Sequence, residues 1–270
     1  KVVNRDGETR YRTRMFLPAT LYDNPNKAFV AQYELNLLDK PAHIRNALLY
    51  GDWYVQAGAF YADEWRRDLH VIQPFRIPPH YTRFRSLDWG FKTWGVCLWW
   101  AVNEDGDMIC EREYSFRYKS ATAVALRIKE IEQEMGIWSD SKARSKLSGP
   151  ADTQLWEERG ESGLSKYEEM AAQGVTWVAA NKKSRERNAQ RFLTRLQDHH
   201  NGTTLPGIMF FEDCRQTIKT IPGIQTDPHN PEEPLKGGDD HWHDAVVYAC
   251  AYRAKPGLER NDSWYDDDDE

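Results

Sequence analysis

The stretch "FRSLDWGFKTWGVCLWW", residues 84–100, decides the fold because two apolar runs are separated by a short break around Gly90. We expect each run to form a β-strand, since both are short and rich in aromatic and aliphatic residues. One acid, Asp88, lies at the end of the first run. An isolated buried carboxylate is costly. Asp88 therefore has either a structural role, such as pairing with a nearby arginine or capping a turn, or a metal ion as its partner.

The residues after this stretch predict a mixed sheet. We expect three consecutive antiparallel strands over 83–90, 93–103 and 107–116, with Asp105-Gly106 as a hairpin turn. Ser120 is the expected N-cap of a helix whose apolar residues recur every three to four positions. Further strands are expected over 174–180 and 203–211, and helices over 121–136, 184–200, 212–221 and 241–255. This order predicts an α/β fold with helices on both faces of the sheet.

Composition narrows the function classes. The chain has 270 residues, of which 40% are hydrophobic and 29% charged, as is typical of a soluble globular protein. No apolar run is long enough to span a membrane. The four cysteines contain no CxxC pair, which argues against a zinc ribbon or a secreted disulfide scaffold and favours buried free thiols. The chain begins with Lys1 and has no signal-peptide pattern, so we expect it to begin inside a longer gene product.

The net charge of −6 does not by itself indicate a nucleic-acid-binding protein. However, the tail "DDDDE" at residues 266–270 supplies five of the negative charges, and the rest of the chain is nearly neutral. A local basic patch can therefore still bind DNA.

Two further acids stand at the edges of predicted elements. Asp152 opens a short helix after Gly149-Pro150, where an N-cap role competes with a ligand role. Asp244 lies in the first turn of the last helix, where a negative charge also complements the helix dipole.

The segment just before Asp244 holds further candidates. Asp240 stands four residues earlier, and two histidines flank Trp242. We expect His243 to lie in a surface turn, and for His241 a surface turn and a ligand role stay open. Carboxylates from three such elements can converge on one or two Mg²⁺ ions, about 3.5–4 Å apart when there are two.

These residues carry a family resemblance. The segments "SLDWG", "GPADTQLWEERG" and "DDHWHDAVVYA" occur in that order, downstream of "DNP" and "ALLYGDW". Together they resemble the nuclease domain of tailed-phage terminase large subunits, over about residues 14–253. That domain has an RNase H-like fold, also found in RuvC-type resolvases and retroviral integrases. The resemblance implies the end of an ATPase region and a linker at 1–82, an RNase H-like nuclease domain at 83–255 and an acidic, disordered tail at 256–270.

The resemblance also implies an activity. From this resemblance we expect the chain to be a metal-dependent DNA endonuclease that cuts concatemeric viral DNA by two-metal phosphodiester hydrolysis, with Mg²⁺ or Mn²⁺ as cofactor. Asp88, Asp152 and Asp244 match the catalytic, metal-binding acids, and either Asp240 or His241 supplies a further ligand.

The implied surroundings are those of a packaging motor. The partners would be double-stranded DNA, the terminase ATPase domain, the small terminase subunit and the portal, in the host cell cytoplasm. A Walker A pattern, GxxxxGK[ST], is absent, so no ATP hydrolysis is expected from this chain alone. A non-catalytic DNA or portal docking module, and a junction-resolving nuclease of the same fold, are the alternatives.

A basic segment, "NKKSRERNAQRFLTRL", is the candidate DNA contact. Three of its arginines are spaced i, i+4 and i+8 and so share one helix face. Such a stripe can hold phosphates without reading sequence, although a solvated helix face explains it equally well. The candidate DNA-binding residues are Lys182, Lys183, Arg185, Arg187, Arg191 and Arg195.

Overall fold

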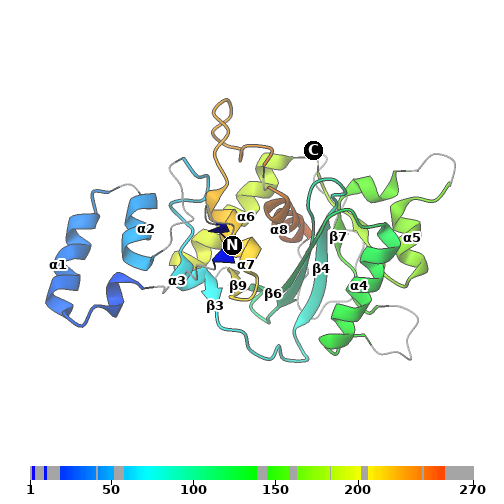
Figure 1. Cartoon of the computed structure of the whole chain (residues 1–270), viewed down its shortest axis with the longest axis horizontal. Coiled ribbons are helices and arrows are strands. Elements are labelled where there is room, and N and C mark those ends of the chain that lie inside the picture. The colour runs from blue at the N-terminus through cyan, green and yellow to red at the C-terminus, as the bar shows by residue number, and fades with distance from the viewer. Residues whose placement is uncertain are drawn as a thin grey trace. The chain divides into compact units, whose positions relative to one another are not determined.

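A computed structural model describes most of the chain, which forms two compact units, residues 1–53 and 54–270 (Figure 1). The described residues are 2–3, 9–10, 19–40, 42–51, 58–138, 145–157, 163–182, 184–201, 206–238 and 240–252. The domain limits expected from the sequence, at residues 82 and 255, stay a prediction, and the acidic tail lies outside the described residues.

The first unit is small and mainly helical. Its elements are a two-stranded antiparallel pair, β1 (Val2–Val3) and β2 (Thr9–Arg10), a 3₁₀ turn at Leu21–Asp23, and helices α1 (Lys27–Leu37) and α2 (Ala42–Tyr50). Asn26 caps α1, since its side chain accepts a hydrogen bond from the backbone N–H of Phe29. The rings of Tyr22 and Tyr50, with centroids 5.9 Å apart, join the 3₁₀ turn to α2.

The second unit is built on a seven-stranded sheet in the order β3-β9-β6-β5-β4-β7-β8. The strands β4, β5 and β6 are antiparallel neighbours, and the other pairings are parallel. The expected RNase H-like mixed sheet is thus confirmed. The strands are β3 (Val71–Ile72), β4 (Thr82–Asp88), β5 (Gly95–Val102), β6 (Met108–Phe116), β7 (Pro150–Ala151), β8 (Val178–Ala179) and β9 (Ile208–Phe211).

Helices cover both faces of this sheet, as the sequence predicted (Figure 1). Strand β5 is buried along its whole length and shows the alternation of the two faces. Val96, Leu98 and Trp100 enter the core that α6 and α8 complete, whereas Cys97 and Trp99 enter the core that α4 completes. The helices are α3 (Arg67–His70), α4 (Ala121–Glu134), α5 (Lys166–Ala172), α6 (Arg185–Asn201), α7 (Arg215–Thr220) and α8 (His241–Tyr252), with 3₁₀ turns at Thr153–Trp156 and Ile221–Gly223.

Several local predictions are confirmed. Ser120 caps α4 by accepting a hydrogen bond from the backbone N–H of Ala123. The β5–β6 turn has Gly106 at a positive φ of 88°. All four cysteines are buried free thiols. Among the described residues, no helix combines the length and apolar character that a membrane crossing requires.

A close approach between β4 and β7 places two of the acids side by side. A Cβ added to Gly149 would lie 1.8 Å from the carbonyl oxygen of Arg85, so only glycine lets the two backbones approach this closely. Leu87 then pairs with Ala151. The acids that follow these two residues on β4 and β7 therefore leave the sheet at the same edge.

A buried ion pair fixes β4 on the face opposite Asp88. The Arg85 guanidinium is 2.6 Å from Glu132 of α4, donates to the carbonyl oxygen of Thr176 at 3.0 Å and lies over the Trp177 ring. Both charged side chains are fully buried. This arginine therefore does not pair with Asp88, because its side chain points to the other face of the strand.

Candidate functional site

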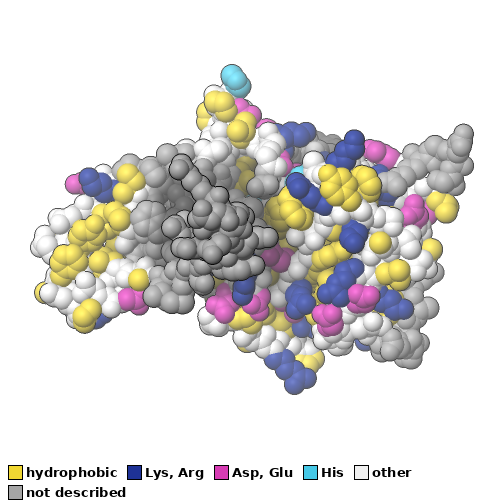
Figure 2. Space-filling model, viewed as in Figure 1, with side chains coloured by type: hydrophobic (Ala, Val, Ile, Leu, Met, Phe, Trp, Pro, Cys, Tyr) yellow, Lys and Arg dark blue, Asp and Glu magenta, His cyan; other side chains and the backbone are white. Residues whose placement is uncertain are grey.

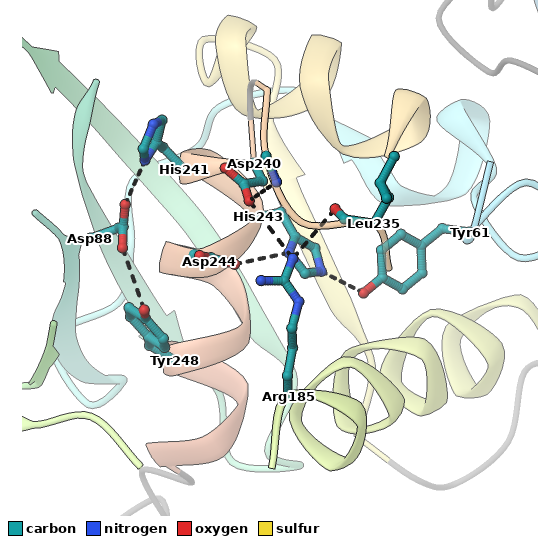
Figure 3. A network of polar contacts seen from close by, with 10 residues as sticks. Tyr61, Asp88, Arg185, Leu235, Asp240, His241, His243, Asp244 and Tyr248 are labelled. Carbon is teal, nitrogen blue, oxygen red and sulfur yellow. Dashed lines mark hydrogen bonds and ion pairs between the residues drawn. The ribbon is translucent and has the colours of Figure 1, made fainter. Parts of the chain in front are cut away.

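Asp88 is the last residue of β4, and its side chain faces helix α8. It is only 4% exposed. His241 Nδ1 lies 2.9 Å from its Oδ2 atom, and the Tyr248 hydroxyl donates to its Oδ1 atom at 3.4 Å (Figure 3). Both partners come from α8, so the packing of this helix on β4 supplies the polar contacts of the carboxylate.

The electrostatics around Asp88 favour a positive charge. Burial raises the pKa of Asp88 to about 7; the hydrogen bond to His241 opposes this shift, and the negative charges of Asp244 and Asp152 add to it. The same hydrogen bond raises the pKa of His241, with Asp240 and Asp244 acting in the same direction. Asp88 is thus close enough to Asp152 and Asp244 to be repelled by both, and a cation would relieve that repulsion.

Asp152 follows β7 and caps the 3₁₀ turn at Thr153–Trp156. Its Oδ1 atom accepts a hydrogen bond from the backbone N–H of Gln154 at 2.9 Å, so Asp152 has the N-cap role that the sequence left open beside a ligand role. The same oxygen lies 2.6 Å from Lys182 Nζ. That ammonium is also 5.3 Å from the centroid of the Tyr248 ring. Lys182 therefore lies beside both Asp152 and the tyrosine that contacts Asp88.

Asp244 lies in the first turn of α8, as expected, and ends a short chain of polar contacts. Its Oδ1 atom is 3.3 Å from His243 Nδ1, and His243 Nε2 is 2.7 Å from the Tyr61 hydroxyl (Figure 3). Burial alone would raise the pKa of Asp244, but the hydrogen bond from His243 and the charges of Arg185 and Lys182 outweigh it and lower the pKa.

The expectation that His243 lies in a surface turn is wrong. The helix begins at His241, which places His243 on its inner face, where the side chain is 1% exposed. There the imidazole packs against the rings of Tyr61 and Phe192. A turn residue was expected because polar residues and glycines precede it, but the apolar helix that follows decides its environment.

Asp240 has a different environment from His241. Its Oδ2 atom accepts a hydrogen bond from the backbone N–H of Gly237 at 2.8 Å and lies 3.7 Å from the Arg185 guanidinium. Arg185 also donates to the carbonyl oxygen of Leu235. Asp240 thereby holds the loop before α8. Of the two candidates for an additional ligand, His241 is the one that touches Asp88.

The donor set suits a hard divalent cation, because carboxylate oxygens from neighbouring elements are the ligands that Mg²⁺ prefers. In the part of the chain that the structure describes, however, no three His, Cys, Asp or Glu side chains are already arranged to hold a metal ion. Protein groups occupy the oxygens: His241 and Tyr248 contact Asp88, and Lys182 contacts Asp152. Metal binding therefore requires some of these contacts to be exchanged.

Two of the predicted DNA-binding residues lie within this site. Lys182 pairs with Asp152 and Arg185 with Asp240. Lys183 lies outside the described residues. Both described cations therefore also compensate the charge of the buried acids.

The predicted arginine stripe lies on α6, which confirms its helical spacing. Arg187 is exposed, and Arg191 is half-buried with a hydrogen bond to Asn188. Arg195 donates to the carbonyl oxygens of Gly106 and Gly207 at 3.1 and 3.0 Å. Arg195 therefore joins two loops, and phosphate binding by the stripe stays a prediction.

Sequence reasoning missed Tyr248 and Tyr61. A signal for Tyr248 was present, because His241, Asp244 and Tyr248 are spaced i, i+3 and i+7 and so lie on one face of a helix. Tyr61 had no such signal, since it lies far from the other site residues in the sequence.

The sequence matches no family model and no curated protein. The fold, in contrast, is similar to solved structures of phage terminases. The nuclease domain of the P22 large terminase has a TM-score of 0.55 at 14% identity, covering 72% of this chain and 92% of that domain. The large terminase of the thermophilic bacteriophage D6E has a TM-score of 0.52 in two crystal forms, at 16% and 17% identity, covering 75% and 86% of this chain. The chain spans 46% and 54% of those two D6E chains. The expected resemblance is thus confirmed for the fold.

Proposed function

We propose that this chain is the metal-dependent DNA endonuclease part of a phage DNA-packaging terminase and cuts concatemeric genome DNA. One observation carries the proposal. Asp88, Asp152 and Asp244 come from β4, the end of β7 and the first turn of α8, and they interact electrostatically at one edge of a sheet with the terminase nuclease fold.

The proposed cofactor is Mg²⁺ or Mn²⁺, held by Asp88, Asp152 and Asp244 with His241 or Asp240 as a further ligand. Such ions, when bound, activate a water molecule and stabilise the leaving oxygen of a phosphodiester. The chain's own residues position the acids. His241 orients the Asp88 carboxylate, and His243, itself held by Tyr61, orients Asp244.

Lys182 has a second role in this proposal. Its ammonium neutralises Asp152 in the structure, at 2.6 Å. With a cation bound to that carboxylate, Lys182 would be available for the phosphate backbone of DNA. The lysine then both stabilises the metal-free site and contributes to substrate binding.

Plasmid cleavage tests the assignment. The chain should nick supercoiled DNA with Mg²⁺ or Mn²⁺ and stop when EDTA is added. Asp88→Asn, Asp152→Asn and Asp244→Asn should each reduce the rate at least about 100-fold, since even residues that only orient metal ligands cost about 10–100-fold. Asp213→Asn, on an exposed residue of the same unit, is the isosteric control. The site assignment is wrong if Asp88→Asn cleaves as fast as the parent.

The same assay separates the alternatives. A non-catalytic docking module would bind DNA in EDTA and would not nick it, whichever metal is added. A junction-resolving nuclease would cleave four-way junctions in preference to linear duplex. The junction-resolving nuclease does not account for the upstream "ALLYGDW" segment.

The wider assembly is part of the proposal. In it, the ATPase domain, the small terminase subunit and the portal are the partners, and the host cell cytoplasm is the location. Co-sedimentation of the chain with portal rings tests the last contact, and failure to sediment at low salt would contradict it.

A further inference from the structure

Two exposed aromatic rings form a pair at the end of the sheet where Asp88 lies. Phe91, in the β4–β5 turn, is 46% exposed, and Tyr118, after β6, is 68% exposed. Their ring centroids are 5.9 Å apart in an edge-to-face arrangement. Tyr118 is the most exposed of the large hydrophobic side chains that the structure describes. Exposing such rings to water costs free energy, and the rings contribute little to a core. Their exposure therefore needs another explanation.

The backbone holds Tyr118 in this exposed position. Its φ of 53° is the only positive φ among the described residues other than glycine. A bulky residue in this region is strained and persists only where surrounding contacts fix it. The backbone N–H of Tyr118 donates to the carbonyl oxygen of Phe91 at 2.8 Å, which ties the two turns together. The hydrogen bond and the ring contact therefore hold Tyr118 at the surface, next to Phe91, in spite of the strain.

The surroundings of the pair are basic. The two turns, 89–95 and 116–120, contain Lys92, Arg117 and Lys119 and no acid. All three side chains are exposed, and none makes an ion pair with a carboxylate of the described residues. Figure 2 shows hydrophobic side chains flanked by Lys and Arg over this end of the sheet. We call these five residues the aromatic–basic platform: Phe91, Lys92, Arg117, Tyr118 and Lys119.

The platform adjoins the candidate site. Phe91 follows Asp88 by three residues, which limits their separation to about 11 Å. The Arg117 guanidinium lies 4.4 Å from the Trp94 ring, and Trp94 contacts Trp242 of α8 with ring centroids 5.6 Å apart. Trp242 stands next to His241. The platform is therefore linked through ring contacts to both elements that hold Asp88. Phe91 lies no farther from Asp88 than about three nucleotides of a DNA strand.

We propose that the aromatic–basic platform binds an unpaired DNA strand beside the cleaved phosphate, with its rings stacked on bases and its cations on phosphates. The proposal rests on the proposed nuclease function. Aromatic rings interleaved with basic residues are the chemistry that recognises single-stranded nucleic acid without sequence preference. A duplex keeps its bases stacked inside, so an apolar exposed ring matches a strand whose end is frayed or opened at the cut.

Equilibrium binding in EDTA tests this proposal without cleavage. The probe is a short duplex with a three-nucleotide single-stranded extension that carries a fluorescent adenine analogue, and the reference is the blunt duplex. Phe91→Ala combined with Tyr118→Gly should weaken binding of the extended probe by about 5- to 150-fold, the range for one base–aromatic stack. Glycine suits the φ of 53° at this position, so this substitution removes the ring without adding strain.

Phe75→Ala is the matched control. Phe75 is 45% exposed, packs edge-to-face on Phe211 and adjoins a basic residue, Arg76, but it lies in the segment after β3. It should leave binding of both probes unchanged. Phe91→Trp in place of Phe91→Ala keeps an aromatic ring at this position. It should therefore restore the quenching of the analogue that stacking causes.

Two results would overturn the proposal: equal losses on the extended and the blunt probe, or fluorescence of the analogue that does not respond to the protein. The first would assign the surface to the duplex backbone, and the second to a protein partner. Neither touches the nuclease assignment, which metal-dependent plasmid cleavage tests. Conversely, a chain that cuts no plasmid but still quenches the probe would contradict only the nuclease function.

Discussion

Replacing Gly149 with alanine tests whether the close approach of β4 and β7 positions the candidate site. The added Cβ would lie 1.8 Å from the Arg85 carbonyl oxygen, which is backbone and has no side-chain freedom to move away. An ordinary contact needs about 3.4 Å, so the strands must separate by about 1.5 Å. The hydrogen bond from the backbone N–H of Asp152 to the Leu87 carbonyl oxygen, at 2.9 Å, lies in this region.

Two quantities should change. The free energy of unfolding should fall by about 1–3 kcal/mol, the usual cost of overpacking. The cleavage rate should fall about 100-fold at a temperature where the variant is folded, because a displacement of about 1 Å in an active site costs that much. Urea unfolding measures the first quantity, and initial rates of plasmid nicking measure the second.

Gly163→Ala is the control for the loss of a glycine alone. Gly163 has a φ of 68° and no atom within 4 Å of an added Cβ. Alanine there should cost about 1–2 kcal/mol through backbone strain, a loss similar to that of Gly149→Ala, yet leave the specific rate of the folded protein unchanged. If Gly149→Ala nicks DNA at the parent rate, or if both variants lose rate equally, the close approach of β4 and β7 does not position the site.

Three further variants probe the buried contacts. Glu132→Leu leaves the Arg85 charge buried without its partner and should cost about 3–5 kcal/mol of unfolding free energy in urea, whereas Arg85→Met added to it should recover most of the loss; additive losses would contradict this. Tyr61→Phe removes the partner of His243 Nε2 and should lower the free energy of unfolding by about 1–3 kcal/mol. It should also lower the metal-dependent cleavage rate about 10–100-fold; a rate at the parent level would argue against positioning through the imidazole. Lys182→Met removes a competitor for a carboxylate and should tighten Mg²⁺ binding up to about fivefold in calorimetry without DNA, the scale of a partly exposed ion pair; weaker binding would oppose the proposal.

The local elements of this protein were predictable because their signals lie within a few neighbouring residues. Alternation and turn chemistry predict β4, β5 and β6, and a serine before an amphipathic run predicts the start of α4. The position of Asp244 in the first turn of the last helix follows from the apolar residues after it. The short strands β7 and β8, with two residues each, carry too little pattern for their limits to be predicted.

The environment of each acid depended on tertiary packing. The sequence marks Asp88 as an acid at the end of a buried strand, but its partners His241 and Tyr248 stand 153 and 160 positions away. Only the packing of α8 on β4 brings them to the carboxylate. The resulting burial, together with the charges of Asp244 and Asp152, raises the pKa of Asp88 to about 7, although the hydrogen bond to His241 opposes this shift. Periodicity determines which face a side chain points to. Which residues pack against that face is decided only when the helix and the sheet come together and exclude water.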